Sequence, residues 1–265
     1  MLKFNGENVV KGRFPNNEVD YVNICTSKEE NKELWDVFEL IYESNEDLFN
    51  LLVMKKRWDD AGWNFKKEKC CLKIKYFPYC QMDREMPTHL FSLKYVAQII
   101  NELKFDNVLV YDPHSNVLPA LINRCEVYYP ITKRKFDNYN LLFYPDNGAA
   151  KKYSEILDMP YRFGNKKRNL DTGEIVCYEV IADKADIEGK RILIVDDMVM
   201  GGRTFVEAAK ALREMGASQV DLYVTHLKPE SRKFYNSKGN GLIDNIYSAD
   251  TLEMIQYFKM PEPRP

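Results

Sequence analysis

The chain has 265 residues, with 38 Lys and Arg against 40 Asp and Glu, so its net charge is −2. This balance excludes the strongly basic class of general nucleic-acid binders, and 45% hydrophobic residues are enough for a packed core, which excludes a disordered chain. No apolar run approaches the ~18 residues that span a bilayer, and the N-terminus has no apolar signal segment. We therefore expect a cytosolic globular protein with no nucleic-acid or membrane partner.

The N-terminal half, residues 1–130, is expected to be one α/β unit. Residues 33–63 look helical, because four apolar residues there recur at helical spacing: Leu34, Val37, Phe38 and Ile41. Cys71–Tyr76 and Asn107–Asp112 are predicted strands. Between them a helix is predicted from the apolar stripe Leu93, Val96, Ala97 and Ile100.

The C-terminal half, residues 131–265, is expected to be a second α/β unit. Tyr161–Val176 is rich in Lys, Arg, Asn and Gly and predicts an exposed loop. The apolar run Arg191–Asp197 predicts a buried strand that ends in two carboxylates. A helix follows, with Thr204 as its predicted N-cap, and Val220–His226 is the next predicted strand.

Strand, helix and strand follow one another twice, at residues 71–112 and 191–226. Such units favour parallel strands joined by right-handed crossovers. The predicted fold class is therefore α/β, with two halves that are each a parallel sheet flanked by helices. We expect the active site to lie between the halves.

The segment Val195–Phe205, VDDMVMGGRTF, carries the clearest chemical pattern. Two carboxylates end a strand, a glycine-containing loop follows, and a helix then begins. A helix N-terminus presents unbonded N–H groups and a positive dipole end, which suit a phosphate, while acids beside it suit sugar hydroxyls. The pattern predicts a sugar-phosphate site; the alternative is an ordinary strand-to-helix turn with solvated aspartates.

Ile194–Asp197 followed by Gly201–Thr204 resembles the ribose-phosphate loop of the type I phosphoribosyltransferases. Further segments resemble, in the family's own order, the ribose-phosphate diphosphokinases, or phosphoribosyl pyrophosphate synthetases. They are Arg13–Val19, similar to R-F-x-D-G-E; Tyr76–Arg84, similar to P-Y-x-x-Y-A-R-Q-D-R; Tyr111–Ser115, similar to D-L-H-S/A; Tyr144–Gly148, similar to S-P-D-x-G; and Asn165–Arg168, similar to D-K-R-R.

The resemblance implies two phosphoribosyltransferase-like halves, usually assembled as a homo-oligomer. It implies transfer of the diphosphoryl group of ATP to the C1 hydroxyl of ribose 5-phosphate, with Mg²⁺ as cofactor and AMP as product. The implied roles are ATP binding by Phe14, Asn16, Glu18, Gln81, Asp83 and Arg84; metal binding by His114 and Asp146; catalysis by Lys166 and Arg168; and ribose-phosphate binding by Asp196, Asp197, Gly201, Gly202, Arg203 and Thr204.

Three departures from the family pattern bear on the substrates. Asn16-Asn17 stands where the family has Asp-Gly, and asparagine tolerates the left-handed conformation, so we expect the turn to persist. Gln81-Met82 replaces Arg-Gln, which removes one cation from the ATP segment. Met200–Thr204 replaces D-T-A-G-T, which removes an acid and adds Arg203. The altered loop favours a larger 5′ group, such as the diphosphate of ADP-ribose.

The two ends of the chain also depart from the family. Only 13 residues precede Phe14, and we expect the family's first strand–helix unit to be absent; little chain follows Ile246, and we expect the usual C-terminal helix to be absent too. Two alternatives to a diphosphokinase stay open. One is a phosphoribosyltransferase that uses a nucleobase, and the other is a non-catalytic regulatory homologue.

Overall fold

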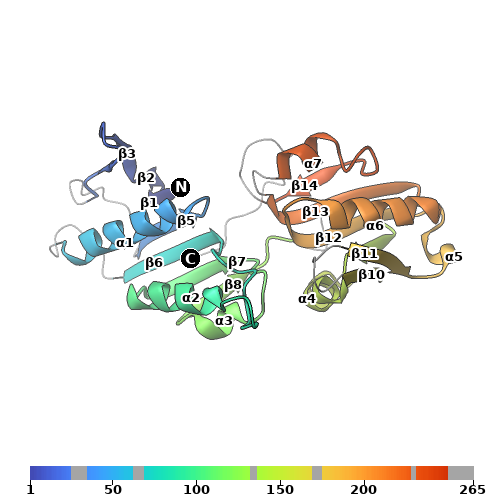
Figure 1. Cartoon of the computed structure of the whole chain (residues 1–265), viewed down its shortest axis with the longest axis horizontal. Coiled ribbons are helices and arrows are strands. Elements are labelled where there is room, and N and C mark those ends of the chain that lie inside the picture. The colour runs from blue at the N-terminus through green and yellow to red at the C-terminus, as the bar shows by residue number, and fades with distance from the viewer. Residues whose placement is uncertain (25–34, 62–68, 132–135, 169–174, 228–230, 250–265) are drawn as a thin grey trace. The chain divides into compact units, whose positions relative to one another are not determined.

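The computed structural model describes residues 1–24, 35–61, 69–131, 136–168, 175–227 and 231–249, and of residues 166–168, 175–177 and 232 it describes only the backbone. The chain divides into two compact units, Met1–Tyr129 and Pro130–Pro265 (Figure 1). Among the described residues, no helix is both long and apolar enough to cross a membrane.

The first unit is a six-stranded sheet in the order β2-β1-β5-β6-β7-β8, with β3 and β4 as a separate hairpin. Its elements are β1 (Leu2–Phe4), β2 (Glu7–Asn8), β3 (Val10–Arg13), β4 (Val19–Tyr21), β5 (Trp35–Ile41), α1 (Asn45–Asp59), β6 (Lys69–Tyr76), α2 (Ser92–Glu102), β7 (Asn107–Tyr111), α3 (Leu118–Leu121) and β8 (Cys125–Tyr128). Strands β5 to β8 are parallel, whereas β1 runs antiparallel to both β2 and β5. Because β5 to β8 follow one another in space as in sequence, right-handed crossovers place α1, α2 and α3 on one face.

The second unit is a six-stranded sheet in the order β11-β10-β9-β12-β13-β14. Its elements are β9 (Leu141–Tyr144), α4 (Asn147–Leu157), β10 (Tyr161–Arg168), β11 (Ile175–Ile181), α5 (Lys184–Ile187), β12 (Arg191–Val199), α6 (Arg203–Glu214), β13 (Gln219–Leu227), α7 (Arg232–Asn236) and β14 (Ile246–Ser248). All neighbouring strands are parallel except β10 and β11, which form an antiparallel hairpin. The predicted fold class is confirmed, with antiparallel strands at one edge of each sheet.

Helices α4 and α6 cover opposite faces of the second sheet. Leu141 and Phe143 of β9 pack into the core beneath α6. Tyr144 points to the other face, where its ring stacks on Tyr153 of α4 with 6.4 Å between centroids. The chain therefore leaves β9 toward one face and β12 toward the other, which makes the β9–β12 pair the switch point of the sheet.

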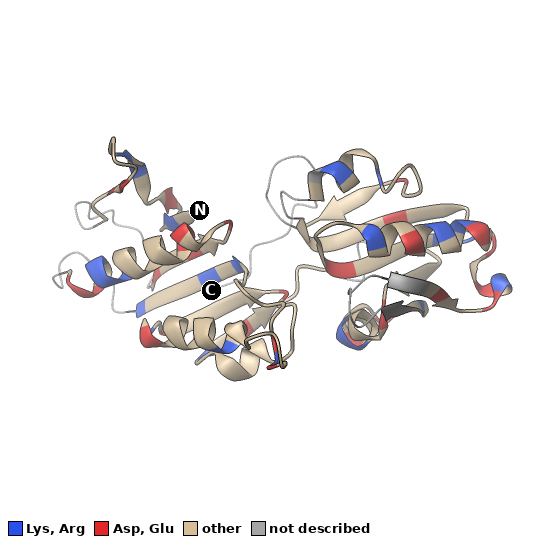
Figure 2. Cartoon of the chain, viewed as in Figure 1, with Lys and Arg blue, Asp and Glu red and all other residues tan. Residues whose placement is uncertain are grey.

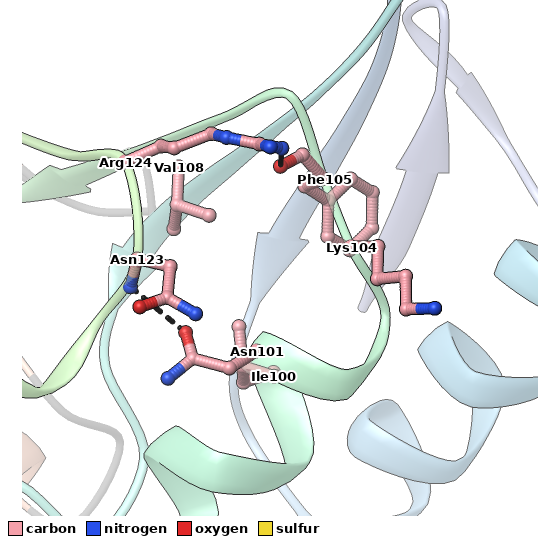
Figure 3. Close-up of a pocket in the computed structure, with 7 residues that line it drawn as sticks. All are labelled: Ile100, Asn101, Lys104, Phe105, Val108, Asn123 and Arg124. Atoms are coloured by element: carbon pink, nitrogen blue, oxygen red, sulfur yellow. Dashed lines mark hydrogen bonds between the residues drawn. The ribbon is translucent and has the colours of Figure 1, made fainter.

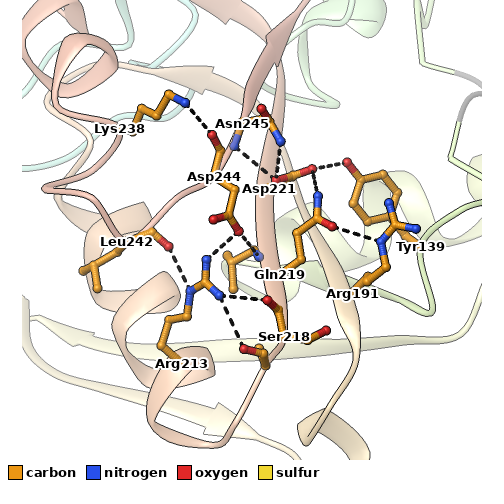
Figure 4. A network of polar contacts seen from close by, with 12 residues as sticks. Tyr139, Arg191, Arg213, Ser218, Gln219, Asp221, Lys238, Leu242, Asp244 and Asn245 are labelled. Carbon is orange, nitrogen blue, oxygen red and sulfur yellow. Dashed lines mark hydrogen bonds and ion pairs between the residues drawn. The ribbon is translucent and has the colours of Figure 1, made fainter.

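The amino end of the second sheet is held by a polar network around Asp221, which is fully buried in β13 (Figure 4). Tyr139 donates its hydroxyl hydrogen to this carboxylate, the Gln219 side-chain amide donates at 2.8 Å and the Asn245 backbone N–H at 3.1 Å. A buried carboxylate is stable only with such donors around it. The network fixes the sheet at the edge opposite to the carboxyl ends of its strands.

The outward face of α6 carries charges of both signs, as Figure 2 shows. Lys210 and Glu214 form an exposed (i, i+4) ion pair at 4.0 Å. The inward face of the same helix is apolar, with Phe205, Ala208 and Leu212 buried. This division is that of an amphipathic helix that covers a sheet.

The helix predicted over residues 33–63 is wrong in its first part. Trp35–Ile41 is strand β5, and the helix is α1, which begins only at Asn45 after the N-cap Ser44. In β5 the side chains of Asp36, Phe38 and Leu40 are buried, which is the period of two of a strand. Leu34 and Trp63, part of the same prediction, lie outside the described residues.

The loop predicted over Tyr161–Val176 is also wrong where the structure describes it. Residues 161–168 and 175–176 belong to the β10–β11 hairpin, whose backbone pairs run from Phe163–Ile181 to Arg168–Ile175. Polar and charged side chains are common in such an edge hairpin, so composition alone does not separate it from a loop.

One further expectation needs correction, since the N-cap of α6 is Gly202, two residues before the predicted Thr204. The expected absence of the family's first strand–helix unit is not contradicted: β1 precedes Phe14, but it runs antiparallel to β5 and residues 1–24 contain no helix. The expected absence of a C-terminal helix concerns residues 250–265, which lie outside the described part of the chain.

Candidate functional site

The carboxyl ends of β9 and β12 bring three aspartates to one edge of the second sheet. The two strands are parallel and in register from Leu141–Ile192 to Phe143–Ile194. Asp146 follows two residues after β9, while Asp196 and Asp197 lie near the end of β12. Open α/β sheets bind ligands at this edge, next to the switch point.

Asp146 has a structural role at this edge. Its carboxylate is the N-cap of α4 and accepts a hydrogen bond from the Ala149 N–H at 3.0 Å. An N-cap of this kind typically stabilises a helix by ~1 kcal/mol. A Cβ added at Gly148 would lie 3.1 Å from the same carboxylate oxygen, so this turn leaves little room for a side chain at residue 148.

Asp196 and Asp197 have different environments although they are neighbours. Asp197 is buried and its Oδ2 lies 3.6 Å from Nζ of Lys152 on α4, whose side chain is 7% exposed. Asp196 is only partly buried, and its Oδ1 accepts the N–H of Asp197 at 2.9 Å. The structure thus places Asp197 in an internal ion pair and leaves Asp196 closer to solvent.

The loop that follows β12 is short, and its two glycines differ. Gly202 has a φ of +77°, and a Cβ there would lie 2.1 Å from the ring of Phe234 on α7. Only glycine fits this position, because both the conformation and the space exclude a side chain. Gly201 instead has open space on its Cβ side.

Helix α6 begins directly after this loop. Its N-terminus has no side-chain cap, since Gly202 carries no side chain; the Phe205 and Val206 N–H groups bond to the Gly202 carbonyl. Arg203 is the first residue of the helix and is exposed, while Thr204 is half-buried. A helix start of this kind favours an anion by its dipole, and Arg203 adds a positive charge.

The residues predicted to be catalytic, Lys166 and Arg168, lie in the outer part of the β10–β11 hairpin. Lys166 is paired in register with Tyr178, and Arg168 with Ile175. Their side chains lie outside what the structure describes.

In the first unit, the residues predicted to bind ATP begin with a tight turn between β3 and β4. The Phe14 N–H bonds to the Glu18 carbonyl at 2.9 Å, and the Glu18 N–H bonds to the Asn16 side-chain oxygen at 3.2 Å. Asn17 adopts a φ of +68°, as its tolerance of the left-handed conformation allows. Phe14 opens this turn and is 53% exposed.

The start of α1 connects this turn to the next predicted segment. Arg13 forms an ion pair with Glu46, at 2.5 Å between Nη2 and Oε1. The Tyr79 hydroxyl donates to the Asn45 side chain at 2.8 Å. Both segments are therefore anchored on the first turn of α1, which follows the carboxyl end of β5.

The segment that follows β6 also contacts the segment that follows β7. The hydroxyl of Ser115 donates to Asp83 at 2.7 Å, next to the exposed His114. Arg84 lies 3.9 Å from Asp83 and its side chain is 80% exposed, while Gln81 is exposed. The residues predicted to bind ATP, together with His114, thus lie at the carboxyl edge of the first sheet. Asp146, which was predicted to bind the metal with His114, belongs to the second unit.

A pocket of about 260 Å³ in the first unit lies at the opposite, amino edge of the sheet (Figure 3). Two of its polar side chains already bond to the protein: the Arg124 guanidinium donates to the Phe105 carbonyl at 3.0 Å, and the Asn101 side chain accepts the Asn123 N–H at 2.9 Å. In Figure 3 the Lys104 side chain points away from the hollow. The pocket contains none of the predicted site residues.

Three residues at the edge of the second sheet were not predicted as site residues: Lys152, Tyr178 and Phe234. Lys151 and Lys152 are adjacent in a helical pattern, and only the spacing of Lys152 from Ala149 places it toward the buried face. Tyr178 and Phe234 act through contacts with residues far away in sequence, for which the sequence carries no local signal.

Comparison with known proteins finds matches to the phosphoribosyl transferase domain and to ribose-phosphate pyrophosphokinases. The pattern of the phosphoribosyl transferase domain matches residues 148–251. The ribose-phosphate pyrophosphokinase of Pyrococcus abyssi is 30% identical over 235 residues, which cover 83% of this chain and 76% of that protein. The ribose-phosphate pyrophosphokinase of a Marinomonas species is 28% identical over 262 residues, which cover 94% and 80% respectively.

A solved structure shows the same fold. The crystal structure of phosphoribosylpyrophosphate synthetase from Mycobacterium smegmatis matches with a TM-score of 0.67 at 18% identity, and the match covers 91% of this chain and 80% of that one.

The buried ion pair at the edge of the second sheet leads to a prediction about stability. Lys152→Met removes the cation that lies 3.6 Å from the buried Asp197 carboxylate, and we expect the free energy of unfolding to fall by about 3 kcal/mol. The control is Lys151→Met on the exposed side of the same helix, for which a change below ~0.5 kcal/mol is expected. Urea denaturation measures both; equal, small effects would contradict the role of the pair.

Proposed function

The chain belongs to the ribose-phosphate pyrophosphokinase family of diphosphotransferase enzymes, and on that premise we propose that it transfers the β,γ-diphosphoryl group of ATP to the C1 hydroxyl of a ribose 5-phosphate moiety and releases AMP. The observation that carries the proposal is the edge of the second sheet, where Asp146, Asp196 and the start of α6 come together beside the switch point. Acids that accept sugar hydroxyls then lie beside a helix N-terminus that attracts a phosphate.

In the proposed reaction, the C1 oxygen attacks the β-phosphorus of ATP. The bond between that phosphorus and the oxygen bridging to the α-phosphate breaks, AMP leaves with the electron pair, and the hydroxyl proton is released to solvent. Negative charge builds on the transferring oxygens, so cations must neutralise it. We assign this role to Lys166 and Arg168.

Mg²⁺ is the proposed cofactor, because it neutralises and orients the phosphates of ATP. The described residues include no group of three or more His, Cys, Asp or Glu that could hold a metal by itself. Mg²⁺ is usually held by one or two carboxylates together with substrate phosphates. A site that offers a single carboxylate, such as that of Asp146, therefore fits Mg²⁺ bound to ATP. We propose that His114 and Asp146 contribute to its binding.

The ribose-phosphate moiety is proposed to bind at the end of β12. Asp196, which is partly exposed, would accept the ribose hydroxyls. Asp197 would act through its ion pair with Lys152, which fixes the backbone beside Asp196. The 5′-phosphate would meet the N–H groups at the start of α6, with Gly201, Gly202 and Thr204 around it.

Two other functions remain to be tested beside this one. A phosphoribosyltransferase would share the end of β12, but the match to that domain covers residues 148–251 alone, whereas the pyrophosphokinase matches cover 83% and 94% of the chain. A non-catalytic regulatory homologue would bind the same ligands without turnover. A direct assay of products separates all three.

The first test follows the adenine nucleotide product. With ATP and Mg²⁺ we expect AMP to form only when a ribose with a free C1 hydroxyl is present, because that hydroxyl is the acceptor. Chromatography of the nucleotides measures it, with 5′-phosphorylated ribose blocked at C1 as the control. Formation of ADP instead of AMP would point to γ-phosphoryl transfer and would contradict the proposal.

The acceptor itself is proposed from the loop before α6. Arg203 is exposed at the helix start, where a second phosphate on the 5′ carbon would gain a charge-assisted contact. The open side of Gly201 gives room for a longer 5′ substituent, whereas Gly202 is closed by Phe234. We therefore propose that ADP-ribose is accepted at least as well as ribose 5-phosphate.

A comparison of the two acceptors tests this. Arg203→Ala should lower kcat/KM for ADP-ribose by ~10-fold or more, the effect of one lost hydrogen bond to a charged group, and should lower it less for ribose 5-phosphate. Lys210→Ala, an exposed cation further along α6, is the matched control and should change neither. A strong preference for ribose 5-phosphate that Arg203→Ala leaves untouched would contradict the larger acceptor.

A further inference from the structure

Strand β10 is longer than its pairing with β9, the strand that joins it to the rest of the sheet. Its pairing with β9 runs from Tyr161–Leu142 to Phe163–Tyr144, while its pairing with β11 continues to Arg168. After Phe163 the backbone ladder of β10 is formed with β11. Lys166 and Arg168, the proposed catalytic cations, both lie in this outer part of the hairpin.

Tyr178 of β11 links the hairpin to the turn that carries Asp146. Its hydroxyl donates to the Pro145 carbonyl at 3.1 Å, directly before Asp146. The phenol passes over Gly164 of β10, where an added Cβ would lie 2.1 Å from the hydroxyl oxygen and 3.0 Å from the Pro145 oxygen. One side chain of β11 thus contacts Gly164 in the middle of β10 and Pro145 directly after β9, close to the point where the β9–β10 ladder stops.

The surroundings of this hydroxyl keep it a donor. Burial raises the pKa of Tyr178 well above its ordinary value, and the negative charges of Asp146 and Asp196 raise it further. The phenol therefore keeps its proton at neutral pH, and a carbonyl, which can only accept, is a matched partner. The hydrogen bond itself places the phenol beside the turn that carries Asp146.

We propose that Tyr178 is a positioning residue, which fixes the β10–β11 hairpin against the Asp146 turn and so sets where Lys166 and Arg168 meet the transferring group. The inference rests on the proposed function for its catalytic consequence. Tyr178 is paired in register with Lys166, so its bond holds the hairpin at the level of the first of these cations.

The test compares Tyr178→Phe with Tyr144→Phe. Tyr178→Phe keeps the ring and removes only the hydrogen bond to Pro145. Tyr144 lies on the neighbouring strand β9, and its buried hydroxyl has no hydrogen-bond partner in the described part of the chain. Removal of this hydroxyl in Tyr144→Phe therefore breaks no hydrogen bond there. Gly164→Ala is a second route to the same effect, since it keeps the phenol but displaces its hydroxyl.

We expect Tyr178→Phe to lower kcat ~5-fold, the equivalent of one hydrogen bond, with KM for ATP and for the ribose acceptor within about twofold of the wild type. Amide hydrogen exchange in residues 161–168 should become faster in Tyr178→Phe and Gly164→Ala and stay unchanged in Tyr144→Phe. The exchange measurement needs no substrate, and the wild-type assay reports on the proposed function separately.

Several results would overturn the inference. Exchange in Tyr178→Phe at the wild-type rate would show that the hydroxyl does not anchor the hairpin. Faster exchange with unchanged kcat would show that the anchor does not position the catalytic cations. Equal losses in Tyr178→Phe and Tyr144→Phe would indicate a general effect on packing. A wild-type protein that forms no AMP with any ribose would overturn the proposed function and, with it, the catalytic role of the anchor.

Discussion

The parallel pairing of β9 with β12 is the constraint on which the candidate site depends. Because Phe143 and Ile194 are partners in register, the end of β9 lies beside residues 195 and 196 of β12, which continues to Val199. The chain turns to α4 on one face after β9 and to α6 on the other face after β12. Asp146 and Asp196 lie at the same edge of the sheet for this reason, although 49 residues separate them in the sequence.

Contacts from both faces hold this edge in place. From the side of α4, Lys152 reaches the buried Asp197. Under α6, Phe234 packs against the backbone of Gly202 and leaves no space for a side chain. The two neighbouring acids of β12 consequently differ: Asp197 ties the strand to α4, and Asp196 lies closer to solvent. An edge held in this way is preorganised, which would lower the cost of binding and orienting the proposed sugar phosphate.

The sequence predicted the parts of the fold that depend on local patterns. The apolar runs that became β6, β7, β12 and β13 were found within two residues of their ends, and the order of the motifs gave the family. The pattern failed at β5, since Val37, Phe38 and Ile41 fit a helix as well as a strand until the start of the helix at Ser44 is known. The β10–β11 hairpin was missed because its signal is backbone pairing, which composition does not report.

In the candidate site, the limits of the sequence were of the same kind. The sequence indicated that acids and glycines follow β12. It did not indicate that Asp197 is more buried than Asp196, or that Gly202 has no room for a side chain whereas Gly201 does. Nothing near Gly202 in the sequence indicates Phe234, and nothing near Tyr178 indicates Pro145, because each contact joins distant segments. The structure therefore adds the contacts that hold the candidate site in place.

The transfer of two phosphoryl groups in one step is the central claim, and labelled ATP tests it most directly. Two preparations of ATP, one labelled at the β-phosphorus and one at the γ-phosphorus, are incubated with Mg²⁺ and the ribose acceptor, and the sugar product is isolated. The account predicts that both labels appear on the sugar in equal amounts. A sugar product that carries only the γ label, or β label that stays with the nucleotide, would contradict it.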